Sequence, residues 1–146
     1  MAAFKQETTI QRSPEDVFAY VSDMTKHGEW GGHDLVVQQT SSGPPGADAG
    51  ATYSSTAQQF GTQRETQTVT EYVPGRRFVF EAKGGLGVAR HVFELTPSGS
   101  GTHVAKSMEL TKPSFLGRLM GFKIKGEQPK SLAEDLRRIK QKLESV

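Results

Sequence analysis

The chain of 146 residues contains no cysteine. This absence excludes disulfide bonds, metal sites built from thiolates and a cysteine nucleophile, and it fits a protein kept in a reducing compartment. The chain also lacks an apolar run of about 18 residues, so no segment is long enough to cross a membrane as a helix. Its first residues lack the basic start and apolar stretch of a signal peptide. We therefore expect a cytoplasmic protein.

Motifs for catalysis and metal binding are missing as well. The chain has four histidines, at positions 27, 33, 91 and 103. Their spacing matches no metal-ligand motif, and no GxSxG nucleophile motif is present. The glycine-rich stretch 84–87 lacks the lysine and hydroxyl residue of a phosphate-binding loop and lies between two predicted strands, so we interpret it as a hairpin turn. The sequence predicts neither a cofactor nor a metal ion.

Positive charge gathers near the C-terminus, although the net charge is only +2. Nine of the 18 lysine and arginine residues lie between positions 112 and 142. A solvated helix face is the simplest interpretation. The alternative is attraction to an anionic ligand, or weak contact with an anionic membrane through segment 112–126. Nucleic acid is not expected as a partner, because no known binding motif accompanies the charge. The oligomeric state cannot be predicted.

Alternation of apolar and polar residues is the main pattern that the chain does contain. A period of two predicts a sheet whose strands are separated by glycine-, proline- or serine-rich turns. The expected strands are 4–10, 35–40, 51–60, 62–73, 76–83, 88–96 and 102–110. Their short connections require antiparallel pairing. The stretch 41–50 is expected to be a mobile loop, and the length of the chain fits a single domain over 1–146.

Helical signals flank this series of strands. Ser13 and Pro14 form a helix start, with Val17, Phe18 and Val21 as its buried stripe. A second short helical turn is expected to end near residues 27–28. At the C-terminus, an apolar residue recurs every three or four positions from 132 to 143, which predicts a helix packed on the sheet, with a kink or restart at residue 129. A long kinked helix across a curved sheet leaves a gap, and this gap is the candidate site.

The order of these elements resembles that of the START/Bet v 1-like (SRPBCC) superfamily, and within it the bacterial polyketide cyclase/dehydrase and lipid-transport group. The segments that carry the resemblance are TTIQRSPEDVFAYVSDMTKHGEW at 8–30, VTEYVPGRRFVFE at 69–81, the Gly101-Thr102 strand start and SLAEDLRRIKQKLE at 131–144. The resemblance implies an α+β helix-grip fold, in which a curved antiparallel sheet of about seven strands surrounds a long C-terminal helix. The superfamily includes carriers, hormone binders, cyclases, hydrolases and co-chaperones, so function must be argued from the site.

Alternation also predicts which side chains face the gap. Since Phe80 and Phe93 should point inward, His91 shares the inner face with Phe93, and Lys106 shares that of Met108. An inner face that mixes such cationic and apolar groups is too polar for a filled core and suits a cavity. The predicted ligand-contacting residues are Trp30, His33, Tyr53, Phe80, His91, Phe93, Lys106, Met108 and Met120.

Several of these residues also have a purely structural interpretation. His91 can be a core histidine, or an exposed one if the register slips. Lys106 can extend its charge to solvent at the sheet edge. Trp30 suits a packing anchor, and Met108 and Met120 suit an ordinary core.

Three functions therefore remain open. The first is a carrier or sequestering protein for a small hydrophobic or amphipathic molecule such as a lipid, polyketide or isoprenoid-like compound. The second is a cofactor-free enzyme of the aromatase/cyclase type, with His91 or Lys106 as proton donor or acceptor. The third is a co-chaperone-like protein that uses segment 112–126 as its contact surface. A roomy cavity would favour the first two functions, and a filled gap would favour the third.

Overall fold

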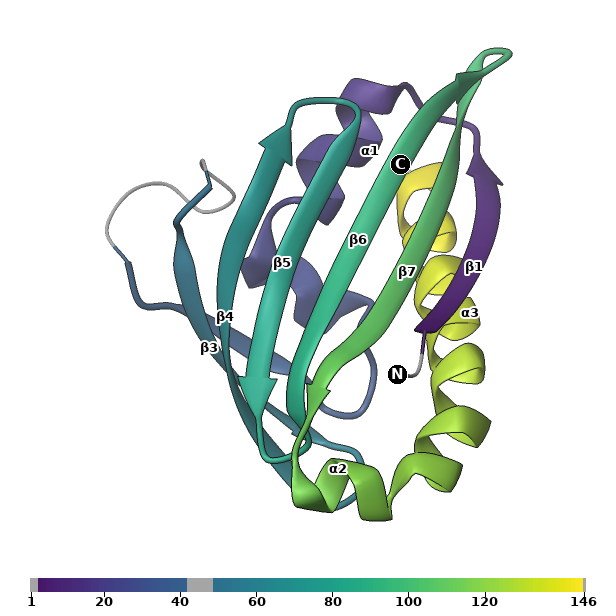
Figure 1. The fold of residues 1–146 in the computed structure, drawn as a ribbon. Helices are drawn as coiled ribbons and strands as arrows, with labels where there is room; N and C mark the ends of the chain where they lie inside the picture. Colours follow the sequence, from purple (N-terminus) through teal and green to yellow (C-terminus); the bar gives the residue numbers. More distant parts are fainter. Residues whose placement is uncertain (1–2, 42–48, 146) are drawn as a thin grey trace.

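Seven strands form one curved antiparallel sheet in the computed structural model, which describes residues 3–41 and 49–145. The sheet order is β1-β7-β6-β5-β4-β3-β2 (Figure 1). The strands are β1 Ala3–Ile10, β2 Val36–Gln39, β3 Thr52–Gln58, β4 Thr62–Val73, β5 Arg77–Gly84, β6 Gly87–Ser98 and β7 Gly101–Pro113. All seven expected strands are thus confirmed, with ends that differ by a few residues. The loop predicted at 41–50 lies largely outside the described residues.

The glycine-rich stretch 84–87 is a hairpin turn between β5 and β6, as predicted. Gly84 pairs with Gly87 across it. Gly87 has a φ of 119°, and a Cβ atom there would collide with the carbonyl oxygen of Lys112. Only glycine fits a backbone that has this positive φ and lies this close to a neighbouring strand.

Two short helices follow β1 and cover one end of the sheet (Figure 1). They are the α-helix α1, Pro14–Val21, and the 3₁₀ helix η1, Met24–Glu29. The Ser13 hydroxyl accepts a hydrogen bond from the backbone N–H of Asp16, which satisfies one free donor of the first turn. The apolar stripe of α1 is buried as expected.

The C-terminal helix α3, Gly121–Glu144, lies across the concave face of the sheet (Figure 1). Its predicted apolar stripe is buried, at Leu132, Leu136, Ile139 and Leu143. The predicted restart at Pro129 is wrong, because α3 continues through this residue, although its axis bends in the lower half of the view. The short helix α2, Phe115–Leu119, precedes α3. Within the described residues, no helix is long and apolar enough to cross a membrane.

Buried apolar side chains of the described residues form two clusters. The larger one joins α1, η1, the central strands and the C-terminal half of α3, and it includes Phe18, Trp30, Phe78 and Phe93. The smaller one joins β6 and β7 to the N-terminal half of α3, through Ala89, Met108, Leu110, Ile124 and Leu132. The candidate site lies where these two clusters meet.

Candidate ligand-binding cavity

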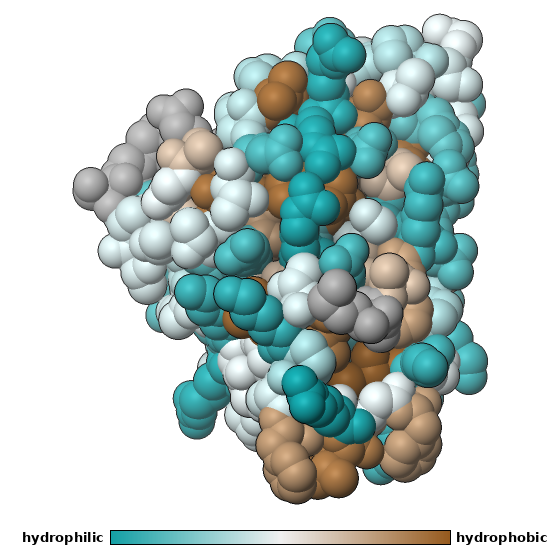
Figure 2. Space-filling view, in the orientation of Figure 1, coloured by the Kyte–Doolittle hydropathy of each residue, from teal (hydrophilic) through white to brown (hydrophobic). Residues whose placement is uncertain are grey.

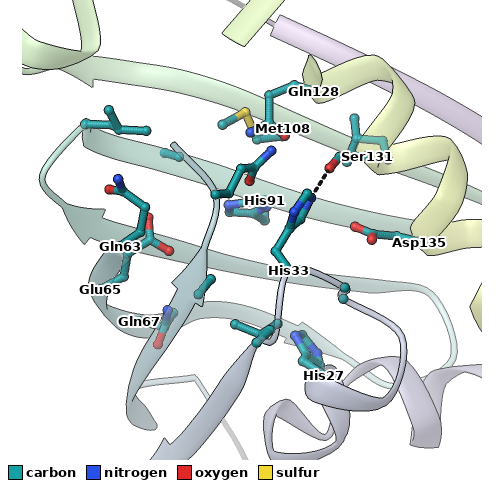
Figure 3. Close-up of a pocket in the computed structure, with 18 of the residues that line it drawn as sticks. His27, His33, Gln63, Glu65, Gln67, His91, Met108, Gln128, Ser131 and Asp135 are labelled. Carbon is teal, nitrogen blue, oxygen red and sulfur yellow. Dashed lines mark hydrogen bonds between the residues drawn. The ribbon is translucent and has the colours of Figure 1, made fainter. Parts of the chain in front are cut away.

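A cavity of about 160 Å³ lies between the concave face of the sheet and α3 (Figure 3). Its apolar lining includes Phe80, Leu86, Ala89, Leu110, Ile124 and Leu132. Its polar lining includes His27, His33, Gln59, Gln63, Glu65, Gln67, His91, Lys106, Gln128, Ser131 and Asp135. A lining that combines apolar walls with polar groups able to orient a ligand is typical of a small-molecule site.

An ion pair closes one side of this cavity. Lys106 on β7 places its Nζ atom 3.7 Å from Oδ2 of Asp135 on α3, and the lysine side chain is only 4% exposed. Burial lowers the pKa of Lys106, although Asp135 counteracts this effect. Burial raises the pKa of Asp135 to about 6, although Lys106 and Arg138 oppose the rise. A desolvated pair of this kind can exchange a proton more readily than exposed side chains.

Aromatic rings and a second cation surround the ion pair. The Lys106 Nζ atom lies 5.6 Å from the ring centre of Trp30 and 5.2 Å from that of Phe93. These faces stabilise the ammonium where water is excluded. Arg138 donates one hydrogen bond to Asp135 Oδ1 at 3.2 Å and another to the carbonyl oxygen of Trp30 at 2.6 Å. The carboxylate is therefore held between two cations.

His91 lies on the inner face of β6, as the alternation predicts. It pairs with Met108, and Phe93 pairs with Lys106, so the register does not shift between these positions. The imidazole stacks on Phe80 with 4.7 Å between ring centres. Burial lowers the pKa of His91 well below its usual value, and the charge of Lys106 lowers it further. The ring is consequently neutral at physiological pH, with one nitrogen able to donate and the other able to accept.

Four buried polar atoms lack a hydrogen-bond partner among the described residues. They are Trp30 Nε1, Gln59 Nε2, Gln67 Oε1 and His91 Nδ1. All four residues line the cavity. Leaving a buried polar group unpaired costs about 1–3 kcal/mol, so such groups are usually satisfied by water or by a ligand. All four belong to residues around the same cavity, and this is stronger evidence for a binding site than the shape of the cavity.

A strained loop borders the cavity near α3. His33 and Asp34 both have a positive φ, of 52° and 54°, as does Phe60, at 56°. The His33 ring bonds Ser131 Oγ on α3 through Nε2 at 2.8 Å (Figure 3), and the His33 carbonyl oxygen accepts from the backbone N–H of Gln58. Left-handed backbone at non-glycine residues costs free energy and often marks functional sites.

The structure brings most of the predicted ligand-contacting residues together. Trp30, His33, Phe80, His91, Lys106 and Met108 all line the cavity. The other three predicted residues do not. Tyr53 and Phe93 are buried in the larger core cluster, because their rings pack against neighbouring side chains instead of facing the hollow. Met120 lies at the junction of α2 and α3 and packs against the smaller cluster.

Sequence reasoning missed several lining residues. Asp135 follows Leu132 by three positions and precedes Leu136, so the helical period places it at the edge of the buried stripe. That position is a usable signal for a buried carboxylate. His27 bonds the carbonyl oxygen of Val21 at 2.8 Å, and burial lowers its pKa to about 4. Gln59, Gln67 and Glu65 had no distinguishing signal in the sequence.

Within 3–41 and 49–145, no cluster of acidic and histidine side chains is suited to a metal ion.

Comparison with known proteins identifies the family. A family profile described as "Polyketide cyclase / dehydrase and lipid transport" matches residues 1–144. The chain belongs to this family. The predicted membership is therefore confirmed. No curated protein sequence matches the chain.

Solved structures share the fold of this family member. Protein TTHA0849 from Thermus thermophilus has 15% identity and a TM-score of 0.80, with 99% of this chain and 98% of that chain covered. The Aha1 dimer from Colwellia psychrerythraea has 16% identity and a TM-score of 0.69, with coverage of 98% and 96%. Ara h 8.0201 has 14% identity and a TM-score of 0.67, with 99% of both chains covered. These likenesses confirm the helix-grip, Bet v 1-like fold.

Proposed function

We propose that this protein binds a small, largely apolar molecule that carries a hydroxyl or carbonyl oxygen, and acts as its carrier or sequestering protein. In this proposal the whole chain, residues 1–146, forms one binding domain. The cytoplasm is still the compartment that we predict. The proposal depends mainly on the four unpaired polar atoms of residues that line a partly apolar cavity. An oxygen-bearing ligand would satisfy atoms that the protein itself leaves without partners.

The size of the cavity limits the ligand. A cavity of about 150 Å³ lined by leucine, isoleucine and phenylalanine is large enough to bind benzene. The cavity here, at about 160 Å³, suits a compact ligand of one or two small rings or a short branched chain. Simple polyketide or isoprenoid-like units meet this limit, whereas a long lipid tail would have to extend beyond the cavity.

The polar groups define how the ligand would lie. His91 Nδ1 and Trp30 Nε1 come from different walls, β6 and the loop after η1, and both residues belong to the lining that also includes Lys106. A ligand oxygen between them would be the natural partner, with the hydrocarbon part directed toward Leu110 and Ile124. Buried polar groups of this kind fix orientation and reject analogues that lack the oxygen.

Fluorescence titration with 2-naphthol and naphthalene tests this function, because the two probes differ by one hydroxyl. We expect 2-naphthol to bind more tightly. In His91→Phe, which keeps a ring against Phe80, that preference should fall by about 0.5–1.5 kcal/mol. His103→Phe is the matched control, because His103 is exposed and contacts Glu7 instead. Equal binding of both probes, or an unchanged preference in His91→Phe, would contradict the proposed polar site.

A cyclase- or dehydrase-type enzyme is the second candidate. The neutral imidazole of His91 and the buried Lys106–Asp135 pair favour it, because both can move protons in a dry cavity. Native mass spectrometry of protein purified from its host would supply the co-purified molecule for an assay. Loss of a general base in His91→Phe should lower turnover by roughly 10²–10⁴-fold. A carrier would show no turnover at all.

The cavity itself weighs against the co-chaperone-like alternative. A protein that only presents a surface needs no hollow lined by unpaired polar atoms, and filling the gap would make it more stable.

A further inference from the structure

The corner formed by α2 and the start of α3 carries apolar side chains that the fold leaves uncovered. Phe115 is 79% exposed and Phe122 is 74% exposed, and Leu116 and Leu119 are also exposed. We call these four residues the apolar tip. Figure 2 shows brown and tan side chains gathered at the lower end of the molecule, where Figure 1 draws α2. Six large apolar side chains are exposed among the described residues, and four of them belong to this tip.

Cations border the apolar tip. Lys112, Arg118, Lys123 and Lys125 lie within or beside it, and Glu127 is the only carboxylate between positions 112 and 130. None of these four cations forms an ion pair with a described residue. By contrast, three of the five basic side chains farther along α3 form ion pairs with carboxylates, namely those of Arg137, Arg138 and Lys140.

Stability of the fold does not account for this arrangement. The first turn of α3 contains no acidic residue and carries Lys123, although negative charge is the favourable sign at a helix N-terminus. Exposed phenylalanines add no packing energy either. Both features instead match the amphipathic surface helices of proteins that bind at the membrane interface.

We propose that the apolar tip docks on an anionic lipid surface, with Phe115 and Phe122 entering the interface and the four cations facing lipid phosphates. A second copy of the chain would fit less well, because a symmetric contact would bring like charges together. An anionic membrane satisfies both the exposed rings and the unpaired cations.

The segments that carry the apolar tip also border the cavity. Ile124 lines the cavity, whereas Phe122, two positions earlier on the same helix, faces outward. The carbonyl oxygen of Leu86, another lining residue, accepts a hydrogen bond from the backbone N–H of Ser114, which caps α2. Docking at the tip would therefore hold this end of the cavity close to the lipid surface, where an apolar ligand is concentrated. Transfer of a ligand between membrane and cavity depends on the proposed ligand binding, whereas docking itself does not.

Co-sedimentation with vesicles tests the docking. The full chain should bind phosphatidylcholine vesicles that contain phosphatidylglycerol, and added salt should weaken binding. Phe115→Ser/Phe122→Ser should weaken partitioning about tenfold or more, because two aromatic rings leave the interface. Val36→Ser/Val73→Ser is the matched control, since these residues are exposed but lie on strands away from the tip.

Charge variants test the electrostatic part of the docking. Lys123→Gln/Lys125→Gln should weaken vesicle binding by about fivefold per lysine, because each cation near an anionic surface contributes to the attraction. Lys26→Gln/Lys142→Gln removes the same charge outside the tip and should leave binding unchanged.

Several outcomes would overturn the proposal. One is equal binding to anionic and neutral vesicles, and another is equal loss in the tip and control variants. A third is concentration-dependent self-association that Phe115→Ser/Phe122→Ser abolishes, which would assign the tip to a second copy. Titration with 2-naphthol keeps the two proposals apart. Vesicle binding without 2-naphthol binding would refute the cavity alone, and the reverse would refute the docking alone.

Discussion

The same sheet and the same helix form both ends of this molecule, but one end is filled with side chains and the other is hollow. At the packed end, where α1 and η1 meet the sheet, the ring of His27 lies 4.4 Å from that of Trp30, and Phe18, Phe78 and Phe93 fill the remaining space. At the hollow end, toward α2, the same strands enclose a cavity, and phenylalanine side chains lie outside on the apolar tip.

Side-chain size along β6 explains much of the difference. Its inward positions run from Leu95 and Phe93 at the packed end through His91 to Ala89 and Gly87 at the hollow end. Because α3 spans both ends, the shrinking side chains leave volume that nothing fills. One end of the molecule therefore supplies stability, and the other supplies a binding site.

Core truncation should show the strongest contrast between the two ends. Leu136→Ala removes buried packing against the larger cluster and should cost about 2–5 kcal/mol of unfolding free energy. Phe122→Ala, on the apolar tip, should change stability by no more than about 0.5 kcal/mol. Urea unfolding of both variants measures this contrast. Similar losses would show that the tip is packed and would remove the distinction.

Acid titration separates the contributions of two buried groups, His27 on η1 and Asp135 on α3. Because the pKa of His27 falls to about 4 on folding, the native state binds fewer protons, and stability is lost as pH drops from its ordinary pKa of about 6.5 toward 4. The pKa of Asp135 rises to about 6, so this residue adds stability as pH falls below that value. Asp135→Asn should therefore steepen the acid loss, to which His27 alone contributes on the order of 3 kcal/mol and to which His91 adds, because burial lowers its pKa as well. Unfolding free energies measured between pH 7 and pH 4 test the sign, and a shallower loss in the variant would contradict it.

A smaller effect on stability and on ligand release is expected from the loop beside the cavity. Ser131→Ala removes the hydrogen bond to His33, and should lower stability by no more than about 1 kcal/mol. Release of bound 2-naphthol should accelerate, because the His33 side chain would no longer be tied to α3. Stopped-flow dissociation measures this rate, with Ser145→Ala at the end of α3 as the control. An unchanged rate would mean that ligand exchange does not pass this loop.

Much of the architecture was predictable because it depends on local patterns. A period of two predicted all seven strands, and the Ser13 cap predicted the start of α1. Alternation from Phe93 and Met108 put His91 and Lys106 on the inner face, and the unshifted pairing of β6 with β7 at these positions preserves that face. Of the kink or restart predicted at residue 129, the restart did not occur, because packing of α3 against the sheet outweighs the loss of one backbone hydrogen bond at the proline.

The order of residues alone determined which side chains share a face, because side-chain direction depends on the repeat of each strand or helix. Tertiary packing decided which faces of the sheet and the helices contact one another. That packing brought Asp135 within 3.7 Å of Lys106, left His91 Nδ1 without a partner among the described residues and turned Phe122 outward. The reason is that these outcomes depend on where α3 lies over the sheet, and that position results from contacts between residues far apart in the chain.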